Sequence, residues 1–69
     1  MTDTKLLRNL IEASGLKYNY IAKKLDLSAY GLQLKIENDN EFKASEITKF
    51  CEILNLDMKT RDKVFFAIM

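Results

Sequence analysis

The chain has 69 residues, 48% of them hydrophobic and 30% charged, which is the balance of one small globular domain and excludes a disordered segment. It lacks histidine and carries a single cysteine, Cys51, so a histidine general base, a structural zinc site and an internal disulfide framework are excluded. The formal net charge of +1 hides an asymmetry, because the first 35 residues carry +3 and the remaining 34 carry −2.

Two further classes are excluded by what the chain does not contain. No apolar run is long enough to cross a bilayer, and the N-terminus lacks the apolar core of a signal peptide, so we expect a cytoplasmic protein without membrane contact. With only two glycines there is no phosphate-binding loop, and Cys51 is expected to pack rather than react. We therefore expect no enzyme, no catalytic residue, no metal and no cofactor.

Apolar residues recur at helical spacing along most of the chain, and no alternating run indicates a strand. Gly15 is a natural C-terminal stop for the first helix, and Asp57 is a candidate N-cap for the last. We predict an all-α fold, a compact bundle of about five short helices in one domain over residues 1–69. The predicted helices span residues 4–14, 18–25, 29–37, 44–54 and 58 to the end.

Residues 17–38 contain the pattern of two short helices joined by a tight turn. Ala22 allows the helices to cross closely, Asp26 tolerates a left-handed backbone, and Ser28 can cap the second helix. Leu32 and Ile36 would face inward. This pattern is typical of a helix-turn-helix, whose second helix enters the DNA major groove, so double-stranded DNA is the expected partner.

The chain resembles the lambda-repressor-like helix-turn-helix family, which includes phage Cro proteins and repressors, over residues 6–66. The matching residues are Ile21-Ala22, Leu25, Leu27-Ser28, Leu32 and Ile53-Leu54-Asn55-Leu56. A small phage-associated branch looks closest, on Lys35-Ile36, Glu41-Phe42, Ser45-Glu46-Ile47, Asp62, Phe65 and Phe66. The resemblance implies a lambda-repressor-like DNA-binding domain that regulates transcription in a bacterial or phage-infected cell.

The predicted helix over residues 29–37 has an outward face opposite its buried residues, at the positions that contact bases in the family. Gln33 can pair with adenine, while Leu34 and Ala29 can pack on thymine methyl groups. Alternatively, Tyr30 and Leu34 cover a neighbouring helix or a partner subunit. Gly31 either permits close approach to DNA or is tolerated drift. The predicted base-reading residues are Ser28, Ala29, Tyr30, Gln33, Leu34 and Glu37.

Phosphate contacts are expected at the start of the helix over residues 18–25, where backbone N–H groups favour anions. Tyr18 stands where the family often has a glutamine, and its hydroxyl can bind a phosphate in the same way. Lys35 either reaches a phosphate or pairs with Glu46. The predicted phosphate contacts are Lys17, Tyr18, Asn19, Lys23, Lys35, Asn38, Asn40 and Lys43.

Apolar residues gather at the C-terminus in greater number than one helix face can bury. One phenylalanine is expected in the core, and we hypothesise that the surplus forms a homodimer contact, since a palindromic operator requires two copies. The candidate residues are Phe65, Phe66, Ile68 and Met69.

Two functions follow from these patterns. The first is a sequence-specific transcriptional regulator of Cro or repressor type, which places residues 28–37 in the major groove and binds a short palindromic operator as a homodimer. The alternative is a protein-interaction module on the same fold, such as an antirepressor or an antitoxin-like partner. The low net charge, the acidic residues of the fourth helix and the aromatic C-terminus favour the alternative.

Overall fold

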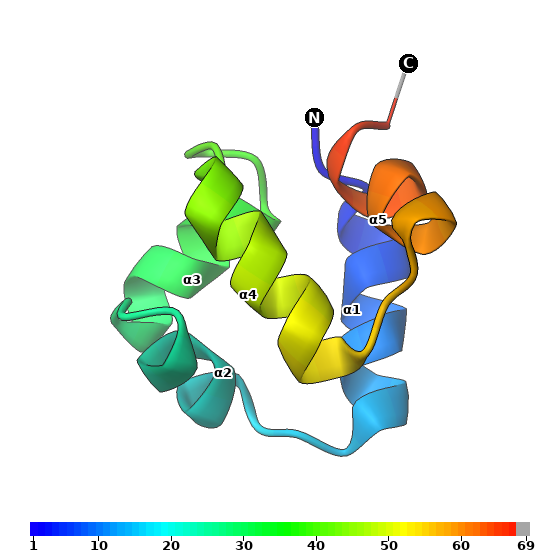
Figure 1. The fold of residues 1–69 in the computed structure, drawn as a ribbon. Coiled ribbons are helices and arrows are strands. Elements are labelled where there is room, and N and C mark those ends of the chain that lie inside the picture. Colours follow the sequence, from blue (N-terminus) through cyan, green and yellow to red (C-terminus); the bar gives the residue numbers. More distant parts are fainter. Residues whose placement is uncertain (68–69) are drawn as a thin grey trace.

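The computed structural model describes residues 1–67, and these fold into α-helices joined by short loops, with no strand among them (Figure 1). This confirms the predicted all-α fold. No helix within the described residues is both long and apolar enough to span a membrane. The five helices are α1 (Thr4–Ser14), α2 (Tyr18–Lys24), α3 (Ala29–Ile36), α4 (Ala44–Leu54) and α5 (Met58–Phe65).

The helix ends are set by local side-chain and backbone chemistry. Gly15 ends α1 in the left-handed conformation at φ 75°, as predicted, and Asn55 ends α4 at φ 54°. The predicted N-cap Asp57 accepts a hydrogen bond from the N–H of Thr60 at 2.8 Å, which lowers the pKa of its carboxyl group.

The prediction that the last helix continues to the end of the chain is wrong. α5 ends at Phe65, and Phe66 leaves the helix with φ −123° and ψ 36°. The N–H of Ala67 donates to the carbonyl oxygen of Met1 at 3.1 Å instead of to the preceding turn of α5. A long-range backbone contact therefore ends this helix.

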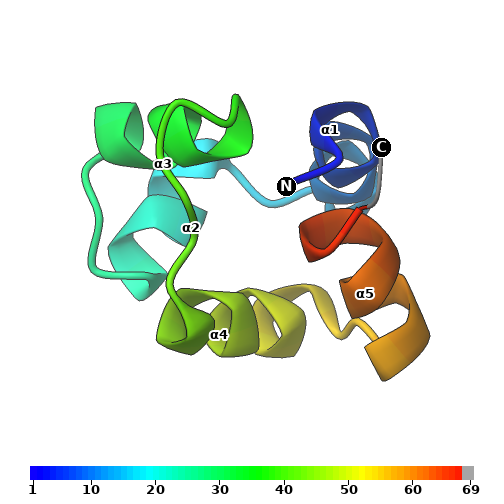
Figure 2. The same cartoon turned by 90° about the horizontal axis from the view of Figure 1, so that it is seen from above.

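The core lies between two helix pairs. Figure 2 shows α2 and α3 on one side and α1 with α5 on the other, with α4 running past both. Three phenylalanines from separate segments, Phe42, Phe50 and Phe65, meet in the middle with ring centroids 5.3–5.6 Å apart. The fully buried large side chains are Leu7, Ile11, Ile21, Leu32, Ile36, Phe50 and Val64.

Residues 1–3 form a short segment that runs between the end of α3 and the end of α5, and we call it the N-terminal clasp. The N–H of Asp3 donates to the carbonyl oxygen of Val64 at 2.7 Å, and the N–H of Thr2 donates to the Oδ1 of Asn38, just past the end of α3, at 2.8 Å. The segment is thus tied to α5 on one side and to the C-terminus of α3 on the other.

Candidate nucleic-acid interface

The turn between α2 and α3 fixes how these helices cross. Asp26 takes the left-handed conformation at φ 60°, as predicted, and the N–H of Leu27 donates to the carbonyl oxygen of Ala22 at 2.8 Å. Ala22 is 2% exposed, and its small side chain lets α3 approach α2. Ser28 then caps α3, accepting a hydrogen bond from the N–H of Gly31 at 2.9 Å.

α3 has one buried face and one open face, as its spacing predicts. Leu32 and Ile36 are 0% and 1% exposed, whereas Tyr30 is 72% exposed. Leu34 is half-buried at the boundary between the two faces. The remaining predicted base-reading residues are exposed, namely Ser28, Ala29, Gln33 and Glu37. The surface is free in the monomer, and its use toward bases stays a prediction.

Gly31 has a structural reason within the protein itself. A Cβ atom at this position would lie 3.1 Å from the Oγ of Ser28, which is the oxygen that caps the helix. A side chain would therefore press on the cap. Close approach to DNA is not required to explain this glycine.

Glu37 is the centre of a hydrogen-bonded group on the open face of α3. Its Oε1 accepts from the Nε2 of Gln33 at 3.0 Å and from a guanidinium nitrogen of Arg8 at 3.4 Å. The side chains of Arg8 and Glu37 are 41% and 40% exposed, so water screens this ion pair. The predicted adenine-reading amide of Gln33 is thus already engaged in the free protein.

A hollow of about 300 Å³ lies between α1, the first turn of α2 and the open face of α3. It brings together residues predicted separately for phosphate and for base contact, because these two segments meet at the helix crossing. Its walls are Arg8, Tyr18, Asn19, Ala29, Gln33 and Ile36.

Lys35 must be removed from the predicted phosphate contacts. Its Nζ lies 2.5 Å from the Oε1 of Glu46 on α4, and the two residues are 8% and 7% exposed. Of the two roles open to it, pairing with Glu46 is the one the structure shows. Burial alone raises the pKa of Glu46, but the hydrogen bonds from Lys35 and from the N–H of Lys43 outweigh it and hold the pKa below its usual value.

Asn38 is also unavailable to a phosphate. Its Oδ1 accepts from the N–H of Thr2 at 2.8 Å, and its Nδ2 donates to the carbonyl oxygen of Thr2 at 2.9 Å and to the hydroxyl of Thr4 at 3.3 Å. These contacts use both hydrogens of the amide. Asn38 adopts φ 67° and connects the end of α3 to the N-terminal clasp.

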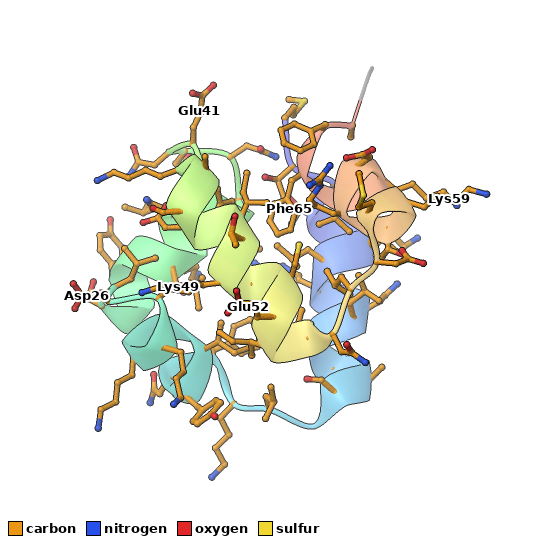
Figure 3. The ribbon with its side chains drawn as sticks, in the orientation of Figure 1. Asp26, Glu41, Lys49, Glu52, Lys59 and Phe65 are labelled. Carbon is orange, nitrogen blue, oxygen red and sulfur yellow. The ribbon has the colours of Figure 1, made fainter. Side chains whose placement is uncertain are left out.

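The other predicted phosphate contacts remain on the surface. Lys43 begins α4, where its N–H is held by Glu46, but its ammonium group cannot act as an N-cap acceptor. Lys49 of α4 extends toward Asp26 at the turn, and both line one hollow (Figure 3). Apart from Asn38, whose amide is already engaged, the exposed members of the predicted set are Lys17, Tyr18, Asn19, Lys23, Asn40 and Lys43.

The model of one protein family, described as "Protein of unknown function (DUF739)", matches residues 3–68. The chain belongs to this family. No curated protein and no solved structure matches the chain. The family description assigns no activity, so the function rests on the surface described above.

The residues predicted to form a dimer contact differ in how exposed they are. Phe65 is 4% exposed and packs against Phe42 and Phe50, so it belongs to the core and has no projecting side chain to offer to a second copy. Phe66 is 53% exposed and remains a candidate. Ile68 and Met69 lie outside the described residues.

Cys51 lies on the inner side of α4, where its surroundings disfavour the thiolate. It is half-buried on α4 against the core, and burial raises the pKa of its thiol. Within residues 1–67 there is no group of three acidic or cysteine side chains placed to hold a metal ion.

Arg8 is the residue of this surface that sequence reasoning missed. Its partner Glu37 lies 29 positions further along the chain, and no local pattern joins the two. The sequence carries one signal, since Arg8 follows the buried Leu7 at the edge of the apolar face of α1.

Proposed function

We propose that this protein is a sequence-specific DNA-binding regulator of Cro or repressor type, with a lambda-repressor-like fold. Residues 28–37 would lie in the major groove, and a homodimer would bind a short palindromic operator in the cytoplasm. One observation supports this proposal most directly. The open face of α3, on which Tyr30 is 72% exposed, borders the same hollow as the exposed first turn of α2.

This arrangement supports the two kinds of contact that specific DNA binding needs. The exposed N-terminal turn of α2 offers Lys17, Tyr18 and Asn19 to the phosphate backbone, which positions the protein. The adjacent face of α3 offers Tyr30 and Gln33 to base edges, which specify sequence.

The turn chemistry supports the same reading. The small Ala22 at the crossing, the left-handed Asp26 and the Ser28 cap are local devices that hold a second helix at a fixed angle to the first. Removing Lys35 and Asn38 from the phosphate set shifts the expected backbone contacts toward α2 and the start of α4.

The experiment is selection of bound duplexes from a random pool, followed by fluorescence anisotropy on the selected duplex and on a scrambled one at several salt concentrations. Joint replacement of Gln33 and Leu34 by Ala should reduce the preference for the selected duplex. Lys17→Ala should weaken binding to both duplexes alike and reduce the salt slope by about one.

Lys59→Ala is the matched control, since this lysine projects from α5 on the opposite side of the molecule from Asp26 (Figure 3). Equal behaviour of the α3 and Lys17 variants would contradict the assigned roles. A stoichiometric protein partner in a pull-down, without DNA affinity at moderate salt, would decide for the protein-interaction module instead.

A further inference from the structure

Phe66 is a large apolar side chain left half in solvent at the end of α5. It is 53% exposed, and one face of its ring is covered by the guanidinium of Arg61, 5.8 Å from the ring centroid. Exposed aromatic rings of this kind are enriched where proteins contact each other.

A hollow of about 210 Å³, with both apolar and polar residues in its lining, lies directly beside Phe66 and shares this residue as part of its wall. Its floor consists of Phe42, Ile47 and Phe65, which belong to the core. A cavity of roughly 150 Å³ suffices to hold a benzene molecule. The hollow therefore has room for one aromatic ring.

The protein thus carries a projecting ring and a hollow that fits such a ring, side by side on one surface. Two copies related by a two-fold axis can each insert Phe66 into the hollow of the other, because a two-fold contact uses the same patch on both subunits. A different partner protein would need a ring to fill the hollow and a hollow to receive Phe66, whereas a second copy supplies both.

The charges around this surface favour the same pairing. Glu41 lies on the rim of the hollow, and Lys63 lies one turn before Phe66 on the other side of the ring. Neither has an ion-pair partner within residues 1–67, while the nearby Asp62 is paired with Arg61 at 3.0 Å. The ring that would be inserted thus has a cation beside it, and the hollow that would receive it has an anion in its lining, so the two halves of the contact are complementary in charge.

We propose that the protein forms a two-fold homodimer in which Phe66 of each protomer fills the hollow over Phe42, Ile47 and Phe65 of the other. The purpose of this dimer rests on the proposed function. Asn38 also lines the hollow and directly follows the last turn of α3, so pairing at this site brings the C-terminal ends of both α3 helices toward the two-fold axis.

The test is sedimentation equilibrium of the full chain and its variants without DNA, with far-UV circular dichroism to verify folding. Phe66→Asp should raise the dimer dissociation constant by at least about thirtyfold, and Phe66→Ala by about tenfold. Met58→Asp is the matched control, because Met58 is 70% exposed on the same helix but lines a different hollow. It should leave the dissociation constant unchanged.

A charge exchange checks the geometry. Glu41→Lys and Lys63→Glu should each weaken the dimer by about two- to fivefold, as expected for an exposed pair. The double variant keeps the net charge of the wild type and should restore the dissociation constant to within about twofold of it.

Three results would overturn the proposal. The first is that the wild type is a monomer at the highest soluble concentration. The second is that Phe66→Asp and Met58→Asp change the dissociation constant equally. The third is that Phe66→Asp still dimerises, whereas the variant with Ile68 and Met69 replaced by Ser does not. Binding of the selected duplex by a monomeric wild type would leave the proposed function standing while this interface fails.

Discussion

Gln33 donates its side-chain amide to Glu37, one turn further along α3, at 3.0 Å. The same carboxylate oxygen accepts from Arg8 of α1. Glu37 therefore holds the amide that would read a base and a guanidinium that could meet a phosphate. The negative charge of Glu37 also lies on the face proposed to approach DNA. It therefore repels the phosphates unless a base of the DNA donates a hydrogen bond to its carboxylate.

Replacing Glu37 by Gln should increase affinity for non-specific duplex DNA by about three- to tenfold at low salt, because one repelling charge disappears and Arg8 is released. The slope of log affinity against log salt should become steeper by about one. Fluorescence anisotropy over a salt series measures both. Glu52→Gln on α4 is the control with the same charge change, and an equal gain there would mean that only net charge matters.

The ion pair between Lys35 and Glu46 should be costly to break from one side. Lys35→Met leaves a carboxylate that is 7% exposed without its cation, and should lower the free energy of unfolding by about 3 kcal/mol. Lys35→Met combined with Glu46→Leu should cost less than Lys35→Met alone. Urea unfolding followed by circular dichroism measures these values. Arg61→Met, which removes an exposed ion pair, should cost below about 1 kcal/mol.

Glu46 also predicts the acid dependence of stability. Its pKa in the folded protein lies below the ordinary value of 4.5, so its contribution is fully present above that value and is lost as the pH falls through the folded pKa. The difference in unfolding free energy between the wild type and Glu46→Gln should be constant above about pH 6 and shrink below about pH 4.5. Asp57 shifts in the same direction in both proteins and cancels. A difference that grows in acid would contradict the sign.

A double-mutant cycle of Gly31 and Ser28 measures how strongly these two residues are coupled in stability. Alanine in a helix interior gains about 1 kcal/mol over glycine, but here its Cβ would lie 3.1 Å from the capping oxygen of Ser28. Gly31→Ala should therefore gain less than about 1 kcal/mol in the wild type and the full amount in a Ser28→Ala background. Thermal unfolding of the four proteins gives the coupling. Additive effects would show that the cap and Gly31 are independent.

Asn38 should be sensitive in two separable ways. Asn38→Gly keeps the left-handed backbone but loses the bonds to the N-terminal clasp, and should cost about 1–2 kcal/mol. Asn38→Ala adds the strain of a positive φ, about 1 kcal/mol more. Denaturant unfolding of both variants measures the two costs. Equal stability of Asn38→Gly and the wild type would mean that the clasp contributes nothing.

The helices were predictable because their signals are local. Gly15, Asp26, Ser28 and Asp57 each act within four residues of their own position, and each adopts its predicted cap or turn role. The two faces of α3 follow from the same short-range periodicity. For such features the neighbouring sequence contains the whole physical cause.

The predictions that were wrong concern residues whose environment is set by contacts between separate parts of the chain. Asn38 pairs with a residue 36 positions away, and the helix that was predicted to continue past Phe65 ends on a bond between Ala67 and Met1. Lys35 lies only 11 positions from Glu46, yet their pairing depends on how α3 and α4 pack. Sequence periodicity placed Lys35 near the inward side but could not choose between its two partners.

The N-terminal clasp has a consequence for the connectivity of the chain. The N–H of Ala67 donates to the carbonyl oxygen of Met1 at 3.1 Å, so the first and the last described residues lie side by side. Figure 1 shows the N-terminus beside the end of α5. A short linker between residues 67 and 1 would join these two ends, and new termini could be opened in the loop around Asn40. In such a circular permutant α3, the helix proposed to read DNA, would lie close to a new chain end. Changes at that end would then alter how firmly α3 packs against the rest of the fold.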